Sequence, residues 1–301
     1  MRDEVLDILK KSIKSDENTQ SSHWKKYHSK FKYDNGILYG LEGFGTNSKP
    51  LKGVKKIIYN LLLKRYHKNI INKSLFQEIK KNAIEIAHKQ NRLFDLDILR
   101  QCLTIDFLSH HKLLNESKTV VVIGDGWGIM TSLLLKLKIV ERVILINLNK
   151  TLLVDLIYTS KVSPKIVDSC ILLEEKSDIS KIKNVKLVAI RADNYGLLRY
   201  VQKDLVINIA SFQEMNIDVI NNYIEYLENG DKSFFLYHCN REEKVLPDGS
   251  ITRIKDFKFK KPKKVIVDDI CPWHKDFITK SPPFIVPFDG ITRHQLYELN
   301  I

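Results

Sequence analysis

The sequence predicts an α/β fold built on a doubly wound, mostly parallel sheet. An apolar run at 120–123 leads into the glycine-rich turn 124–128 and then into apolar residues at helical spacing. Strand-like and helix-like segments then alternate up to residue 237, which is typical of parallel strands joined by helices. After residue 240 the pattern changes to short strands and a turn, which predicts antiparallel pairing. These observations indicate a Rossmann-like domain with antiparallel C-terminal strands, preceded by an α-helical N-terminal extension.

We place the boundary between the helical extension, 1–112, and the α/β domain, 113–301, where the strand pattern begins. The opening residues predict a charged amphipathic helix rather than a signal peptide. Apolar residues recur at helical spacing in three further segments, and we expect each stripe to be buried in the core. The stripes are Val54, Ile57, Ile58, Leu61 and Leu62; Leu75, Phe76, Ile79, Ala83 and Ile86; and Leu93, Leu96, Leu99, Leu103 and Phe107.

The turn at 124–128 has the spacing G-x-G-x-G, formed by Gly124, Gly126 and Gly128. Glycines allow a ligand to approach the backbone closely, and the start of the following helix offers N–H groups. A dinucleotide site has the spacing G-x-G-x-x-G, but Ile129 stands where its third glycine would be. The turn therefore predicts a nucleotide-type cofactor other than a dinucleotide, with a structural turn as the alternative.

The later elements follow in regular order. We expect a strand at 143–146, a helix at 151–158, and strands at 185–190, 205–209 and 233–237. A helix at 217–227 is expected to be closed by Gly230. Residues 243–246 and 251–254 predict a β-hairpin, and 264–267 and 292–299 predict the last strands. Polar residues gather after strands of the sheet, where ligands bind in such folds.

The amino-acid composition and net charge exclude some classes of function and favour others. No apolar run approaches 18 residues, so we expect no membrane span. The four cysteines are far apart in sequence, which favours reduced thiols in a cytoplasmic protein and argues against a zinc site. The net charge of +13 favours an anionic partner. Because the lysines are spread along the whole chain, we favour a small-molecule or glycan substrate over nucleic acid.

Three stretches together resemble the sugar O-methyltransferase family, which consists of bacterial enzymes that depend on S-adenosylmethionine (SAM). They are VVVIGDGWG at 120–128, DLVINIASFQEM at 204–215, and YHCNREEKVLPDGSITRIKDF at 237–257 with VDDICPWH at 267–274. The resemblance covers about 119–300 and implies SAM as the cofactor. It implies cofactor contacts from Gly124, Asp125, Gly126, Trp127, Gly128, Asn147, Asp193 and Ser211.

Two positions depart from the usual methyltransferase pattern. Val122 stands where an acidic residue often precedes the first glycine. Asn147 (or Asn149) stands in place of the acidic residue that usually accepts hydrogen bonds from the ribose hydroxyls. An amide oxygen makes a weaker hydrogen bond than a carboxylate does. Asp125 could instead face the ammonium group of the cofactor.

O-methylation needs a group that takes the proton of the acceptor hydroxyl. We expect His238 or Glu214 to be this base, since both follow strands of the sheet. A structural histidine and a helix cap are the respective alternatives. A neighbouring metal is not expected, and Asp268 and Asp269 are the only candidates for holding one. Substrate contacts are expected from Asn240, Arg241, Glu242, His274 and, in a glycine-rich loop, Tyr39.

The leading hypothesis is SAM-dependent O-methylation of a sugar hydroxyl on a nucleotide-sugar, glycan or lipopolysaccharide precursor. The second hypothesis, based on net charge, is an RNA or DNA methyltransferase. The third is a non-catalytic Rossmann-like module in a glycan-assembly complex, which Val122 and Asn147 favour. SAM binding separates the first two hypotheses from the third. The sequence leaves the oligomeric state open.

Overall fold

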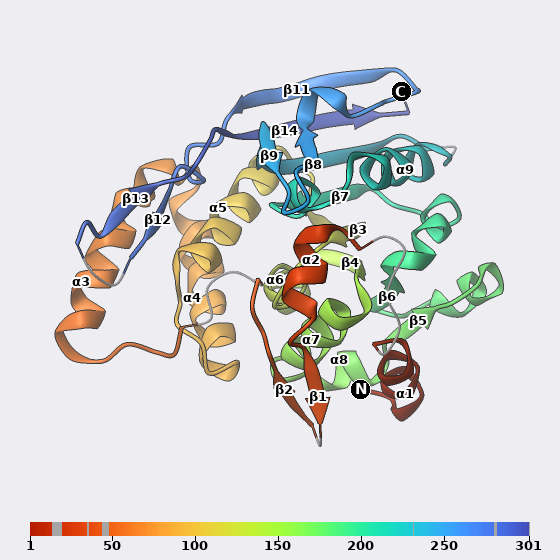
Figure 1. Cartoon of the computed structure of the whole chain (residues 1–301), viewed down its shortest axis with the longest axis horizontal. Coiled ribbons are helices and arrows are strands. Elements are labelled where there is room, and N and C mark those ends of the chain that lie inside the picture. Colours follow the sequence, from red (N-terminus) through yellow and green to blue (C-terminus); the bar gives the residue numbers. More distant parts are fainter. Residues whose placement is uncertain (14–19, 35, 44–47, 231, 280–281, 301) are drawn as a thin grey trace.

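The computed structural model describes residues 1–13, 20–34, 36–43, 48–230, 232–279 and 282–300. Its centre is an eight-stranded sheet with the strand order β11-β14-β8-β7-β3-β4-β6-β5 (Figure 1). The six strands from β5 to β8 in this order pair in parallel, and β14 runs antiparallel to both β8 and β11. The predicted fold class is therefore confirmed. The strands are β3 (Asn115–Ile123), β4 (Val140–Asn147), β5 (Ile171–Leu173), β6 (Leu187–Arg191), β7 (Leu205–Ile209), β8 (Phe234–Arg241), β11 (Lys263–Ile270) and β14 (Thr292–Leu299).

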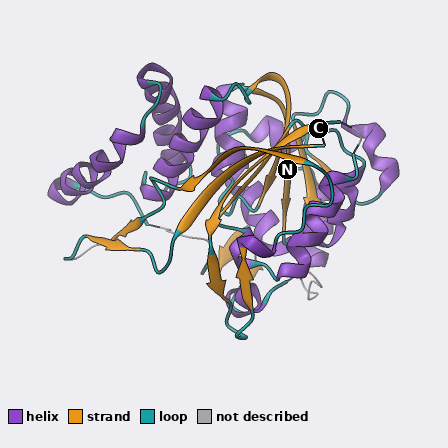
Figure 2. Ribbon diagram, turned by 90° about the horizontal axis from the view of Figure 1, so that it is seen from above, coloured by secondary structure: helices purple, strands orange, loops and turns teal. Residues whose placement is uncertain are grey.

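Helices cover both faces of this sheet (Figure 2). Alternate residues of β3 show the division: Val120 and Val122 belong to one buried apolar cluster, whereas Val121 and Ile123 belong to the other. Since both faces are buried, the central strands read as continuous apolar runs. Three helices follow the glycine turn, namely α6 (Ile129–Leu137), α7 (Asn149–Ser160) and α8 (Pro164–Asp168), and α9 (Ile217–Glu228) packs on the opposite face.

The first third of the chain contributes α1 (Asp3–Ser12), α2 (Ser22–His28), α3 (Gly53–Lys64), α4 (Lys73–Lys89) and α5 (Leu96–His110). The stripes on α4 and α5 are buried as predicted except for Leu75 and Leu93, which are half-buried. The buried members join the same apolar cluster as Val120 and Val122 of the sheet. The prediction for α3 is wrong. Val54, Ile57, Ile58 and Leu61 are exposed because this helix projects from the body of the protein. The domain boundary at residue 112 stays a prediction.

Short elements account for the other differences from the sequence prediction. The edge strand β5 has only three residues, which is too short for a periodic signal. The helix α9 ends at Glu228, and its C-cap is Asn229 rather than the predicted Gly230. The predicted hairpin is present as β9 (Glu243–Val245) and β10 (Ile251–Arg253). Two further hairpins join β1 (Lys32–Asp34) to β2 (Ile37–Tyr39) and β12 (Asp276–Ile278) to β13 (Ile285–Pro287). Turns of 3₁₀-helix are η1 (Arg65–Asn69), η2 (Lys176–Ile182), η3 (Ala192–Arg199), η4 (Phe212–Glu214) and η5 (Ile254–Asp256).

Among the described residues, no helix combines the length and the apolar character that crossing a bilayer requires. All four cysteines are buried free thiols that form no disulfide bond with one another.

Candidate functional site

The glycine turn follows the central strand β3 and is held between β7 and α7. Gly124 and Gly128 both have positive φ angles, +76° and +62°, which favour glycine. A β-carbon on Gly124 would lie 2.5 Å from the β-carbon of Ser211, at the end of β7. A β-carbon on Gly128 would lie 2.6 Å from the carbonyl oxygen of Asp155 on α7. Two of the three glycines are therefore required by close packing as well as by backbone conformation.

Asp125 caps the helix that follows the turn. Its carboxylate accepts hydrogen bonds from the backbone N–H groups of Met130 (2.9 Å) and Thr131 (2.7 Å). Burial raises the pKa of this carboxyl group, while these hydrogen bonds act in the opposite direction. The carboxylate is thus engaged by the first turn of α6. Asp125 also lines the cavity described below, and its contact with the ammonium group of a cofactor stays a prediction.

Asp155 is a buried carboxyl group that the sequence analysis missed. It accepts a hydrogen bond from the backbone N–H of Gly128 (3.1 Å) and another from the side-chain amide of Asn147 (2.8 Å). Burial and the nearby Asp125 raise its pKa well above the usual value. A lone aspartate within the otherwise apolar face of α7 was the available signal. Asp155 fixes the turn to the end of β4.

Asn147 is occupied by these contacts. Its amide nitrogen donates to Asp155, and its side-chain oxygen accepts from the backbone N–H of Leu148 at 2.9 Å. The amide therefore holds the local structure together instead of presenting both of its groups to a ribose.

Trp127 packs against Tyr158 and Arg92 beside the turn. Its ring is buried and meets the ring of Tyr158 edge-on, with the ring centres 4.9 Å apart. The guanidinium carbon of Arg92 lies 4.4 Å from the centre of the Trp127 ring. Trp127 and Arg92 both line the cavity that lies beside Gly124 and Gly126.

A cavity of about 310 Å³ lies against this open side. It is bounded by the glycine turn, by the end of β7 and by side chains that come from distant parts of the sequence. The residues that matter here are Gly124, Asp125, Gly126, Trp127, Ser211, Glu214, Arg241 and His274. The structure thus brings together eight of the predicted site residues at the carboxyl ends of the parallel strands.

Ala210, which precedes Ser211, also lines this cavity and has a φ of +58°. Such a conformation is unfavourable for a residue with a β-carbon and is concentrated at functional sites in proteins. The backbone N–H of Ala210 donates to the carbonyl oxygen of Cys239 on β8 (2.8 Å), and this bond supports the bend.

Glu214 lies where this cavity meets a second, smaller one. Its Oε1 accepts a hydrogen bond from Lys244 Nζ (3.2 Å) and lies 3.5 Å from His23 Nε2. Burial raises the pKa of Glu214, whereas Lys244 and Arg241 lower it. Burial and nearby lysines lower the pKa of His23 to about 4, so that this imidazole is neutral at pH 7. Glu214 is therefore a carboxylate of increased basicity at the cavity wall.

His274 is the second titratable group of the larger cavity. It is buried, and its Nε2 has no hydrogen-bond partner among the residues that the structure describes. Burial, Arg100 and His294 lower its pKa, so that the ring is neutral. A neutral imidazole nitrogen without a partner, at the wall of a cavity, can accept a hydrogen bond from a ligand or donate one to it.

Arg241 supplies the positive charge of the cavity. Its backbone N–H donates to Gln213 (2.8 Å), while its guanidinium carbon lies 5.6 Å from the centre of the Phe288 ring. No ion pair within the described ranges involves its side chain. By contrast, Arg100 donates to Asp97 (2.6 Å) and to the carbonyl oxygen of Trp273 (2.9 Å). Arg241 is consequently the better candidate for binding an anionic group.

The smaller cavity, of about 20 Å³, lies between the ends of β4, β6 and β7. Asn147, Ala192 and Ser211 line it from the sheet. Ser21 and Trp24 cover it from α2 and the residue before this helix, which together we call the α2 segment. The Ser21 hydroxyl donates to the carbonyl oxygen of Glu214. The N-terminal extension therefore lies over the crevice at this end of the sheet.

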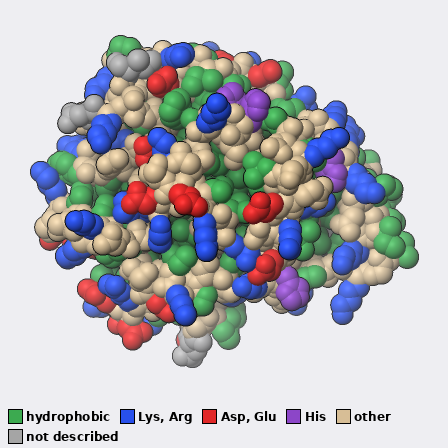
Figure 3. Space-filling model, turned by 180° about the vertical axis from the view of Figure 1, so that it is seen from behind, with side chains coloured by type: hydrophobic (Ala, Val, Ile, Leu, Met, Phe, Trp, Pro, Cys, Tyr) green, Lys and Arg blue, Asp and Glu red, His purple; other side chains and the backbone are tan. Residues whose placement is uncertain are grey.

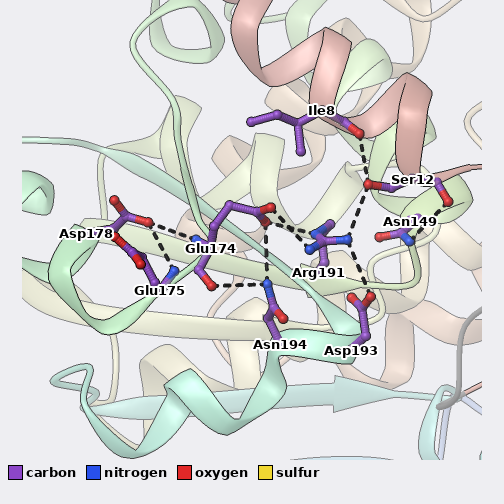
Figure 4. A network of polar contacts seen from close by, with 9 residues as sticks. All are labelled: Ile8, Ser12, Asn149, Glu174, Glu175, Asp178, Arg191, Asp193 and Asn194. Carbon is purple, nitrogen blue, oxygen red and sulfur yellow. Dashed lines mark hydrogen bonds and ion pairs between the residues drawn. The ribbon is translucent and has the colours of Figure 1, made fainter.

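A polar network holds α1 at the ends of β5 and β6 (Figure 4). Arg191 donates to both carboxylate oxygens of Glu174, at 2.8 and 3.1 Å, and to the Ser12 hydroxyl at 3.2 Å. The predicted cofactor residue Asp193 is exposed and pairs with Arg191 at 3.4 Å. It lines neither of the two cavities, whereas its neighbour Ala192 does.

A network of buried amides joins β3, β7 and β8. Asn208 donates to the carbonyl oxygen of Ile123 (3.1 Å) and accepts from Asn240 (3.0 Å) and from the backbone N–H of Phe212 (3.0 Å). Asn240 in turn accepts from the backbone N–H of Gln213 (3.1 Å). Asn240 is fully buried, so its expected contact with a substrate is corrected to a structural role.

His238 lies apart from both cavities. Its side chain is fully buried on the sheet face covered by α9, with ring centres of Phe257 and Tyr297 at 5.5 and 5.8 Å. Burial lowers the pKa of His238 to about 3. A histidine at this position cannot reach an acceptor in the cavity, so the geometry does not favour it as the base.

The remaining predicted residues lie at other surfaces. Glu242 and Asp268 both pair with Arg293, each at 2.9 Å, and Asp269 accepts from the backbone N–H of Ile270. Tyr39 is exposed on the β1–β2 hairpin, outside the cavity lining. Within the described part of the chain, no three His, Cys, Asp or Glu side chains are placed to hold a metal ion.

Comparison with known proteins gives distant similarities of fold. No protein-family model and no curated protein matches the chain. A proposed RNA methyltransferase from Pyrococcus horikoshii aligns with 75% of this chain and all of its own, at 11% identity and a TM-score of 0.45. The methyltransferase domain of a bacterial Hen1 protein aligns with 68% and 100%, at 14% identity and a TM-score of 0.39. A proposed methyltransferase solved with S-adenosylhomocysteine (SAH) aligns with 60% and 45%, at 10% identity and a TM-score of 0.37.

Proposed function

We propose that this chain is a SAM-dependent methyltransferase. The single observation that carries the proposal is the position of the turn Gly124–Gly128. The turn ends the central parallel strand and borders a cavity that also holds a basic carboxylate, Glu214, and the guanidinium of Arg241, which makes no ion pair with any residue that the structure describes. Ligands of open α/β sheets bind at this edge of the sheet. When bound, SAM supplies an electrophilic methyl group.

The residues of the turn would hold the methionine end of the cofactor. The backbone of Gly124 and Gly126, together with Ser211, borders the larger cavity. The N–H groups of Gly124 and Gly128 are already used, by the carbonyl oxygen of Ile146 (3.0 Å) and by Asp155 (3.1 Å). The smaller cavity, of about 20 Å³, has room for roughly one water molecule. An adenosine group at the ends of β4 and β6 therefore requires Ser21 and Trp24 to move outward.

The acceptor that we propose is a hydroxyl group of an anionic sugar compound, such as a nucleotide-sugar, glycan or lipopolysaccharide precursor. Arg241 is placed to bind the anionic substituent, and His274 to make a hydrogen bond to a hydroxyl. Glu214 accepts the proton that the acceptor hydroxyl loses. Its raised pKa suits this task because a more basic carboxylate takes a proton more readily.

Calorimetry with SAM and with SAH tests the cofactor. We expect both to bind, and we expect Gly124→Ala to abolish binding. Methyl transfer from radiolabelled SAM to sugar nucleotides and to bulk RNA then tests the acceptor. Transfer to RNA alone would replace the sugar with a nucleic-acid substrate, which the net charge of +13 favours. Absence of SAM binding to both the wild type and Trp24→Ala would overturn the proposal.

A non-catalytic module is the second candidate function. The covering of the smaller cavity by Ser21 and Trp24 favours it, as does the engagement of Asn147 by Asp155. Trp24→Ala distinguishes the two candidates because it removes the indole from both cavities. SAM binding by this variant supports the enzyme even if the wild type binds slowly.

A further inference from the structure

The helix α3 exposes an apolar surface that the body of the protein leaves uncovered. Val54, Ile57 and Leu61 are 69%, 68% and 65% exposed, and Ile58 is 42% exposed. At 3.6 residues per turn these four side chains span an arc of roughly 100°. We call this arc the α3 apolar stripe. Contiguous exposed apolar side chains of this kind mark sites of interaction.

The attachment of α3 directs the stripe outward. Leu63 is buried, and the Tyr59 hydroxyl accepts a hydrogen bond from the backbone N–H of Leu96 (3.2 Å). On the helical wheel these two residues lie opposite the stripe. The helix is therefore fixed to the protein along one side and presents its apolar side to the surroundings.

The segment that carries the stripe contains only basic charged residues, one of which, Arg65, pairs with Asp276 (3.8 Å). Residues 48–77 contain eight basic residues, Lys49, Lys52, Lys55, Lys56, Lys64, Arg65, Lys68 and Lys73, and no Asp or Glu. On the wheel, Lys55 flanks one side of the stripe and Lys64 the other. Neither takes part in an ion pair within the ranges that the structure covers. Figure 3 shows this edge of the molecule, at the right, as hydrophobic side chains lying among Lys and Arg.

We propose that α3 lies in the surface of an anionic phospholipid bilayer. A helix with an exposed apolar side, flanked by lysines, lies in the interface with its apolar side among the acyl chains and its lysines at the lipid phosphates. The proposal is independent of the methyltransferase proposal, because α3 contributes no residue to the two cavities of the candidate site.

Charge complementarity decides between a bilayer and a second copy of the chain. A two-fold contact between two α3 stripes would bring Lys55 and Lys64 of each copy against the lysines of the other, with no nearby acidic side chain in residues 48–77. An anionic lipid surface instead neutralises Lys55 and Lys64.

Co-sedimentation with vesicles tests the proposal. We expect the protein to bind vesicles of equal parts phosphatidylcholine and phosphatidylglycerol, and to bind pure phosphatidylcholine much more weakly. Binding should fall about tenfold or more when salt is raised from about 50 to about 500 mM. Absence of binding to the anionic vesicles at low salt would overturn the proposal.

Two sets of variants locate the surface. The double variant Ile57→Gln with Leu61→Gln should weaken vesicle binding by about tenfold or more, since each side chain loses its burial in the acyl region. The matched control, Ile84→Gln with Val245→Gln, changes two other exposed apolar residues (47% and 60%) and should bind like the wild type. Lys55→Gln with Lys64→Gln should weaken binding to anionic vesicles, whereas Lys255→Gln with Lys258→Gln should not. Equal binding by the two apolar double variants contradicts the proposal.

Sedimentation velocity without lipid tests the alternative, in which a second copy of the chain binds the α3 apolar stripe. A dimer that Ile57→Gln with Leu61→Gln dissociates, together with absent vesicle binding, would assign the stripe to a second copy of the chain. Circular dichroism checks that each variant is folded. SAM binding should be unchanged in all of them, which separates this test from that of the methyltransferase proposal.

Discussion

Gly124 and Ser211 face each other across the ends of β3 and β7. A β-carbon on Gly124 would come within 2.5 Å of the β-carbon of Ser211, and the backbone of Gly124 has a φ of +76°. The contact closes the turn against β7 on one side and leaves the other side of the turn open to the larger cavity. Glycine is therefore needed here for two separate reasons.

Gly124→Ala should abolish SAM binding and destabilise the fold by about 1–3 kcal/mol, because the backbone strain and the overlap with Ser211 add up. Thermal unfolding and calorimetry measure the two effects. Gly249→Ala is the matched control, since Gly249 also has a positive φ (+84°), but an added β-carbon there would meet no atom within 4 Å. Wild-type SAM affinity in Gly124→Ala would contradict the proposed cofactor position.

Glu214→Gln should reduce turnover by about 100-fold or more and leave the affinity for SAM nearly unchanged, because it removes a base and keeps the shape. The pKa of Glu214 is raised by burial, and only the deprotonated form accepts a proton. The wild-type rate should therefore increase with pH through this raised pKa. Glu243→Gln, on the exposed β9–β10 hairpin, is the control. Equal losses of turnover and of SAM affinity would place Glu214 among the cofactor contacts instead.

Arg241→Gln should raise the KM for an anionic acceptor by roughly 10–100-fold with a smaller change in kcat, since a hydrogen bond to a charged group is lost in the bound complex. Steady-state kinetics with an anionic acceptor and with its neutral analogue measure this. The neutral analogue should show little change. Arg253→Gln, which breaks a surface ion pair with Glu243, serves as the control. An unchanged KM for the anionic acceptor would remove Arg241 from the substrate site.

Asn208→Ala should lower the free energy of unfolding by about 3 kcal/mol, because the amide of Asn240 and the N–H of Phe212 would lose their buried acceptor. Urea denaturation measures the change. Asn222→Ala removes one exposed hydrogen bond, to the Tyr195 hydroxyl, and should cost less than about 1 kcal/mol. A similar small loss in Asn208→Ala would show that the amide network contributes little.

His238 should make stability depend on pH. Its pKa is lowered from 6.5 to about 3 in the folded protein, so the unfolded chain binds more protons between these values. The free energy of unfolding therefore rises with pH across this window. At pH 5, protonation of His238 in the unfolded chain lowers it by about 2 kcal/mol. Urea denaturation at pH 5 and pH 7 should show a smaller difference for His238→Gln than for the wild type. His110→Gln, on an exposed residue, should keep the wild-type difference. An unchanged difference in His238→Gln would mean that this imidazole is not buried in its neutral form.

The candidate site could be predicted from the sequence only in part. The glycine turn and Glu214 were predictable because the turn directly follows β3 and Glu214 lies in the turn after β7, and strand ends in a parallel sheet share one edge. His238 and Asn240 follow the same logic but lie within β8, two residues apart, so both face the same side of the sheet, where they are fully buried. Asp155 was missed because it lies in mid-helix and meets the turn only after α7 packs on it.

The sequence by itself determined the α/β class, the central strand, the glycine turn and the amphipathic helices α4 and α5, because period and turn chemistry are local properties of the chain. The tertiary structure decided which polar residues share a cavity, that the α2 segment covers the smaller cavity, and that the α3 apolar stripe is exposed. An apolar stripe specifies a side of a helix but not what covers that side. Burial depends on packing between segments that are distant in sequence, and no local pattern contains this information.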